Sequence, residues 1–135
     1  MLTDRIARPA HTLALALLAA ALPLGTAHAD AKNDDAMKAL ALNSGCFICH
    51  HVESGAKGPN GMAPIGPNWE DVSAKYTGQK GAADTLTKSV MLGSNPYSSH
   101  WTGKVSGLAM PPNATAIKEA DARKLVNWIL GLKKP

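Results

Sequence analysis

Two cysteines and a histidine stand within one short run, Cys46-Phe47-Ile48-Cys49-His50. A Cys-x-x-Cys-His run is typical of covalent attachment of a c-type haem. Thiols at this spacing share one turn of the chain, so each can reach one vinyl group at the edge of the haem. The histidine after them is then carried beneath the ring, where its imidazole can ligate the iron. This run constrains the fold strongly, because a large, rigid, apolar group would become part of a small core.

Other kinds of site use the same cysteine spacing. A structural zinc site needs four protein ligands, commonly from two such pairs, and the chain contains only two cysteines. A thioredoxin-like site requires a strand before the pair, and no alternating or β-branched run precedes Cys46. A redox-active disulfide between Cys46 and Cys49 remains the main alternative to haem attachment.

The N-terminal segment has the pattern of a secretory signal. Arg5 and Arg8 precede an apolar run over residues 10–24, and a small-x-small motif typical of a signal-peptidase site stands at residues 27–29. The apolar run is shorter than the ~20 residues that a membrane-spanning helix needs.

We therefore expect residues 1–29 to be a cleaved signal peptide and residues 30–135 to be a single domain with no stable membrane anchor. Export would place the chain in the periplasm, where bacterial c-type haem is attached. A retained membrane anchor is the alternative.

Composition argues against several functions. The formal net charge is only +4, and no basic block or aromatic-interleaved patch indicates a nucleic-acid partner. The lysines are expected to form a solvated surface, with docking to an acidic protein partner as the alternative. No catalytic triad, carboxylate pair or phosphate-binding loop is present, so the chain is not expected to be an enzyme.

Periodicity predicts an all-α fold with long loops. The strongest helix is expected over residues 119–132, where apolar side chains recur at the helical period. Those side chains belong to Ala122, Leu125, Trp128, Ile129 and Leu132. Shorter helices are expected over residues 34–42, 69–76 and 82–92. Residues 54–67 are expected to form a loop rich in glycine and proline, and residues 93–116 are expected to be irregular. Strand patterns are nearly absent.

The residue opposite His50 would decide between an electron carrier and a haem with an open site. The candidates are Met62, Met91, Met110 and His100. Met91 falls within an apolar helical pattern, where methionine usually fills the core. Met62 is close to His50 along the chain, in a glycine-rich loop.

Met110 is the favoured candidate because two prolines come directly after it. Pro111 and Pro112 stiffen an extended backbone, and a residue before proline is kept out of the helical region. Such a segment can hold a thioether at a set distance from the iron. Asn113 is expected to donate an amide hydrogen to the sulfur.

The order of these motifs resembles the small bacterial class I monohaem cytochromes c. The resemblance covers almost all of residues 34–132. It rests on Gly45-Cys46-Phe47-Ile48-Cys49-His50, Ile65-Gly66-Pro67-Asn68-Trp69, Met110-Pro111-Pro112-Asn113 and Leu125-Val126-Asn127-Trp128-Ile129.

That resemblance implies the cytochrome c fold, with four to five short helices and long loops wrapped around one covalently bound haem c. It implies thioether bonds from Cys46 and Cys49, with His50 as the proximal iron ligand and Met110 as the distal one. The first and last helices are expected to cross near right angles.

Two further roles come from the same resemblance. In the family a proline carbonyl accepts the second N–H of the proximal histidine. Pro67 matches this position, with Pro59 in a second Gly-Pro pair as the alternative. The family also places a propionate-binding tryptophan shortly before the distal methionine. Trp101 resembles it but stands farther from Met110, so core packing is the alternative.

The expected function is that of a soluble, monomeric, periplasmic one-electron carrier. It would exchange electrons with transient redox protein partners in a respiratory chain. One alternative is a cytochrome c subunit bound tightly to a larger oxidoreductase. Another is a haem enzyme or ligand sensor with an open distal site.

Overall fold

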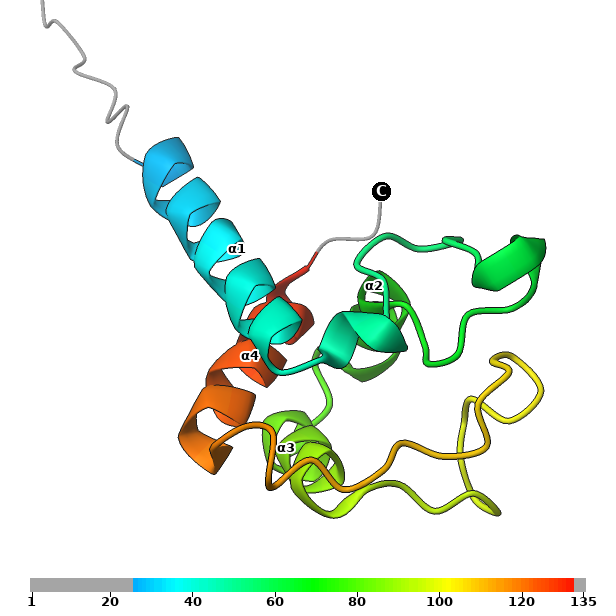
Figure 1. The fold of residues 1–135 in the computed structure, drawn as a ribbon. Helices are drawn as coiled ribbons and strands as arrows, with labels where there is room; N and C mark the ends of the chain where they lie inside the picture. Colours follow the sequence, from blue (N-terminus) through cyan, green and yellow to red (C-terminus); the bar gives the residue numbers. More distant parts are fainter. Residues whose placement is uncertain (1–25, 133–135) are drawn as a thin grey trace, which may run out of the picture.

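The computed structural model describes the backbone of residues 26–132 and the side chains of residues 31–132. Within this part of the chain it contains four α-helices, two short 3-10 turns and no β-strand (Figure 1). The elements in chain order are α1 (Thr26–Asn43), η1 (Cys46–Ile48), η2 (Pro59–Gly61), α2 (Trp69–Tyr76), α3 (Ala82–Leu92) and α4 (Glu119–Gly131). The all-α class with long loops is confirmed.

The first helix is longer than the sequence pattern predicted. We expected it to begin near Asp34, but α1 begins at Thr26. Alanine is the best helix former, and alternate positions from Ala27 to Ala31 are alanine, with no glycine or proline within α1. The helix therefore runs across the predicted cleavage point before Asp30. The remainder of the predicted signal peptide, residues 1–25, lies outside the described residues.

The bounds of the other helices agree with the pattern. The structure has α2 and α3 over the predicted residues, and α4 begins at Glu119 as expected. It ends at Gly131, one position before the predicted end. Lys118 precedes α4 without a capping side-chain hydrogen bond. Instead, the acidic side chains of Glu119 and Asp121 in its first turn interact favourably with the positive end of the helix dipole.

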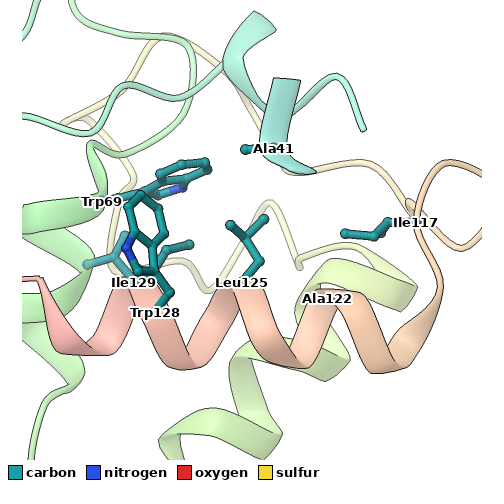
Figure 2. Packing of buried hydrophobic residues seen from close by; sticks show 8 residues of the cluster. Ala41, Trp69, Ile117, Ala122, Leu125, Trp128 and Ile129 are labelled. Carbon is teal, nitrogen blue, oxygen red and sulfur yellow. The ribbon is translucent and has the colours of Figure 1, made fainter. Parts of the chain in front are cut away.

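The hydrophobic core lies along one face of α4. In Figure 2 the side chains of Leu125, Trp128 and Ile129 rise from this helix toward Trp69 of α2 and Ala41 of α1. The indole rings of Trp69 and Trp128 meet edge to face, with centroids 5.7 Å apart, a favoured aromatic geometry. Four of the five predicted α4 core residues are buried, and Leu132 is half-buried.

The N-terminal helix is tied to α4 by a polar contact as well as by packing. The indole Nε1 of Trp128 donates a hydrogen bond of 2.8 Å to Asp34 Oδ1. Trp128 is only 8% exposed, and a buried indole N–H usually finds such a partner. The crossing of α1 over α4 (Figure 1) is thereby fixed at one point along α1.

Side chains of α2 and of Thr77, the residue after it, satisfy the carbonyl groups at the end of α4. Ser73 Oγ lies 3.1 Å from the carbonyl oxygen of Leu130 and 2.7 Å from that of Leu132. Thr77 Oγ1 donates a 2.9 Å hydrogen bond to the Leu130 carbonyl. The last carbonyls of a helix lack partners within the helix, so these hydroxyls fasten α4 to α2.

Candidate functional site

The two cysteines lie on the η1 turn that comes after α1. Gly45 adopts φ 72° at the junction, a conformation that glycine takes without strain. The backbone N–H groups of Cys49 and His50 both donate to the Cys46 carbonyl, at 3.2 and 3.1 Å. The turn therefore holds both thiols together and delivers His50 directly after them, as the sequence spacing predicted.

Both thiols are free and half-buried. Burial raises the pKa of Cys46, and the neighbouring Cys49 adds to this effect while a backbone hydrogen bond opposes it. Cys46 is therefore a protonated thiol at neutral pH, and the structure contains no bond between it and Cys49.

The imidazole of His50 is oriented by the loop after it. Its Nδ1 donates to the carbonyl oxygen of Pro67 at 2.7 Å, so the alternative acceptor, Pro59, is not used. A second bond, from Gly66 N to the Cys49 carbonyl at 2.6 Å, fixes this loop beside the cysteine turn. With the proton on Nδ1, the lone pair of Nε2 is available, and Nε2 has no hydrogen-bond partner in the described part of the chain.

Close packing holds the His50 ring in this position. The ring stacks on Trp69, with centroids 5.8 Å apart and planes 24° apart. A Cβ atom placed on Gly66 would lie 2.6 Å from His50 Cε1, so only glycine fits there. Burial lowers the pKa of His50, against the opposing effect of the Pro67 hydrogen bond. The ring is thus neutral at neutral pH, the form that ligates a metal ion.

The segment that contains Met110 is fastened to the end of α3. The backbone N–H of Ser94 donates to the Met110 carbonyl at 3.0 Å, and Met110 N donates back to Ser94 Oγ at 2.9 Å. Farther along, Asn113 N donates to the Val90 carbonyl at 3.0 Å. A Cβ atom on Gly93 would lie 2.9 Å from the Met110 carbonyl oxygen. The half-buried Met110 is therefore held on a fixed backbone.

The expected contact of Asn113 with the methionine sulfur is not formed. The side-chain amide of Asn113 donates instead to the carbonyl of Pro111 at 2.7 Å and to that of Val90 at 3.3 Å. These carbonyls lie within reach because the Pro-Pro turn folds back against α3, and backbone oxygen is a stronger acceptor than thioether sulfur.

The other candidate ligands have different surroundings. Met91 packs against the hydrophobic core, as its place in the helical pattern predicted. Met62 is 58% exposed in the loop after His50. His100 is exposed and accepts a hydrogen bond of 3.0 Å from Lys104 Nζ. Met62 also makes backbone hydrogen bonds, to Gly58 and Pro59 of its own loop, whereas the hydrogen bonds of Met110 join it to Ser94, in a different segment just after α3.

Two long loops complete the site. Ser106 N donates to the Pro64 carbonyl at 2.9 Å, and Gly107 N donates to the Ile65 carbonyl at 3.0 Å. These bonds join the loop after His50 to the loop before Met110. In Figure 1 both loops, drawn in green and yellow, extend to the same side of the helices. These bonds close the chain between His50 and Met110 into a loop, here called the frame.

The frame carries apolar side chains that the protein itself leaves uncovered. Ile65 is 38% exposed, Leu92 64% and Leu108 87%. Exposed apolar surface of this kind usually marks a place where another apolar body binds. Together with the free thiols and the available Nε2 of His50, these side chains fit a large, flat, covalently attached haem.

Comparisons with known proteins show the family of this chain. The family model for cytochrome c matches residues 35–133. The chain is 42% identical over 93 residues to cytochrome c-551 of Allochromatium vinosum, covering 69% of this chain and 82% of that protein. It is 34% identical over 114 residues to cytochrome c-552 of Nitrosomonas europaea, covering 84% and 88% of the two chains. The chain therefore belongs to the cytochrome c family.

A solved cytochrome structure is also similar to the structure of this chain. The crystal structure of wild-type Nitrosomonas europaea cytochrome c552 aligns with a TM-score of 0.55 at 34% identity, over 71% of this chain and 99% of that one. The molecule is a small class I monohaem cytochrome c, an electron carrier with one covalent haem c. The predicted family, fold, cofactor and general function are confirmed. Between residues 26 and 132, no helix has the length and apolar character needed to span a membrane.

Proposed function

We propose that this chain is a periplasmic one-electron carrier in which Cys46 and Cys49 form the thioether bonds to haem. His50 and Met110 ligate the iron from its two faces. The observation that carries this proposal is the 2.7 Å hydrogen bond from His50 Nδ1 to Pro67, which leaves Nε2 as the ligating atom. The fixed backbone of Met110 at the end of α3 supports the second ligand.

When bound, the haem iron supplies the one-electron chemistry by alternating between the ferric and ferrous states. The carbonyl of Pro67 keeps the His50 ring in one orientation and raises its basicity. The thioether of Met110 favours the ferrous state more than a second imidazole would. If His50 and Met110 both held the iron, they would leave no position for oxygen or peroxide, which would suit electron transfer and not catalysis.

Trp101 is proposed to donate its indole N–H to a haem propionate. Within the described residues its indole N–H makes no hydrogen bond, whereas that of Trp128 does. Trp101 is half-buried and lines a cavity that Pro67 also lines. Its greater distance along the chain from Met110 is accommodated by the loop of residues 102–109, which folds back onto Pro64 and Ile65.

We further propose that residues 1–29 are removed on export and that residues 30–135 act as a monomer. Removal before Asp30 would shorten α1 without touching the Asp34–Trp128 hydrogen bond. Electrons would pass between transient redox protein partners in a respiratory chain.

Mass spectrometry of the secreted protein tests haem attachment. The expected mass is that of residues 30–135 plus one haem. The mass of the bare processed chain, from cells competent to assemble c-type cytochromes, would contradict the proposal.

Substitution of the distal ligand tests the coordination. The Met110→Ala protein is expected to lose the weak ferric sulfur-to-iron absorption band and to bind carbon monoxide when reduced. Met62→Ala is the matched control, because Met62 is exposed in the opposite loop, and it should keep the band and exclude carbon monoxide. Unchanged spectra in Met110→Ala would eliminate Met110 as the ligand.

A further inference from the structure

Two buried polar side-chain atoms make no hydrogen bond within the described part of the chain. They are Oδ1 of Asn68, just before α2, and Oγ1 of Thr87 on α3. Burying a polar atom without a partner destabilises a folded protein, and native proteins contain few such atoms. Asn68 is only 4% exposed, and it directly follows Pro67, whose carbonyl accepts the hydrogen bond from His50.

Asn68 stands at the N-cap position of α2 but does not cap the helix. Asparagine at this position usually accepts a hydrogen bond from an amide of the first turn, yet the Asn68 side chain forms no such bond. The amide of Glu70, in that turn, donates instead to the Val52 carbonyl at 3.0 Å. Nδ2 of Asn68 donates to the Ala56 carbonyl at 3.2 Å. The side chain therefore joins the start of α2 to the loop after His50, and its oxygen is left without a donor.

The part of the loop that accepts this hydrogen bond is itself held against α2. Ser54 N donates to Glu70 Oε2 at 2.6 Å, and Ser54 Oγ donates to Asp71 Oδ1 at 2.7 Å. Both carboxylates belong to the first turn of α2. Because Ser54 is two residues before Ala56, these bonds fix the acceptor carbonyl of Ala56 relative to the helix.

The peptide group between Pro67 and Asn68 connects this contact to His50. A peptide group is planar, so the Pro67 carbonyl can turn only together with the backbone nitrogen of Asn68. Proline has no N–H, so Pro67 cannot fix its orientation through a backbone donor. On the other side, Trp69 N donates to the His51 carbonyl at 2.9 Å. The side chain of Asn68 and the amide after it therefore hold the carbonyl where His50 Nδ1 reaches it at 2.7 Å.

We infer that Asn68 is a positioning residue that sets the strength of the His50–Pro67 hydrogen bond and, through it, the reduction potential of the attached haem. This inference rests on the proposed ligation of the iron by His50. A strong hydrogen bond from the second ring nitrogen makes the imidazole a more basic ligand, and a more basic ligand favours the more positively charged ferric iron. The unpartnered Oδ1 follows from this arrangement, because the Asn68 side chain is directed by its Nδ2.

Asn68→Leu in the haem-bearing protein tests the inference, because leucine has the same branched shape but no hydrogen-bond donor. In the ferrous protein, the Nδ1 proton of His50 is expected to exchange with solvent roughly three- to tenfold faster, the effect of weakening one hydrogen bond. Its NMR resonance is expected to shift upfield, and the potential is expected to rise in a potentiometric titration. Asn68→Ala removes the donor without adding apolar atoms, and the same changes are expected if Asn68→Leu does not fold.

Thr87→Val is the matched control. It also replaces a buried side chain that has an unpartnered polar atom by an apolar one of the same shape, but on α3. It should leave the exchange of the Nδ1 proton and the potential unchanged. A residue that acted only through overall stability would not separate Asn68 from Thr87 in this way.

Two results would overturn the inference. One is an exchange rate or a potential that stays unchanged in the Asn68 variants while the haem and the ferric sulfur-to-iron band are retained, which would leave the proposed function standing. The other is an equal change in Thr87→Val, because the effect would then be one of overall stability. An unsubstituted secreted chain without haem would refute the proposed function, and the inference with it.

Discussion

Replacing Gly66 by alanine should disturb His50 more than any other single methyl group added to this loop. The new Cβ would lie 2.6 Å from His50 Cε1, 2.9 Å from Nδ1 and 3.0 Å from Nε2. Since the ring is held against Trp69, it must rotate or move with its loop. Extra atoms in a packed interior cost about 1–3 kcal/mol, and loss of the Pro67 hydrogen bond adds about 1 kcal/mol.

The expected loss is therefore roughly 2–4 kcal/mol in the free energy of unfolding. Denaturant unfolding of the haem-bearing protein, monitored by circular dichroism, measures it. Gly131→Ala is the control, because no atom lies within 4 Å of its added Cβ and it is within α4. That substitution should stabilise the protein by up to about 1 kcal/mol.

The reasoning also predicts a spectroscopic change in Gly66→Ala. The Nδ1 proton of His50 should shift in the NMR spectrum and exchange faster than in the unsubstituted protein, because its hydrogen bond to Pro67 is weakened. A Gly66→Ala protein as stable as Gly131→Ala, with that proton unchanged, would refute the argument from close packing.

Three other substitutions test separate contacts. Ser73→Ala should lower the free energy of unfolding by about 1–3 kcal/mol, because the Leu132 carbonyl loses its hydroxyl partner; a loss below the error of denaturant titration would contradict this. Asp34→Ala should destabilise the protein by about 1–3 kcal/mol by leaving the buried Trp128 indole without an acceptor. Asp34→Asn keeps an acceptor oxygen, so near-equal losses in the two variants would show that the bond contributes little. Met110→His should lower the reduction potential in a potentiometric titration, and an unchanged value would remove Met110 from the iron.

Periodicity predicted α4 well because its apolar face is continuous. Ala122, Leu125, Trp128 and Ile129 are all buried as expected, and the pattern omitted only Val126, which is 3% exposed. A stripe of this kind reports which side of a helix meets the core. It does not show that the flank on which Val126 lies is buried as well.

The start of α1 was predicted less well for a different reason. The apolar positions Met37, Leu40 and Ala41 mark only the half of α1 that packs against the core. The alanine-rich half before them forms helix through intrinsic propensity, which leaves no periodic signal.

Within the site, local motifs predicted residue types, while their partners depend on contacts between distant segments. The choice of Pro67 over Pro59 depended on the matching residues after Pro67, and the His50 hydrogen bond agrees. The predicted partner of the Asn113 side-chain amide was wrong. That partner depends on how the segment with the two prolines packs against α3 at Val90. No local pattern indicates that Ser94 forms hydrogen bonds with Met110.

The bridge at Pro64 and Ile65 consists of two peptide hydrogen bonds and a 3.3 Å hydrogen bond from Ser106 Oγ, between loop residues that are exposed or half-buried. Such bonds contribute only about 1 kcal/mol each, far less than global unfolding requires. The hydrogen bonds of the bridge can therefore break locally while the four helices stay folded. The amides of Ser106 and Gly107 should therefore exchange with solvent well before those of α4.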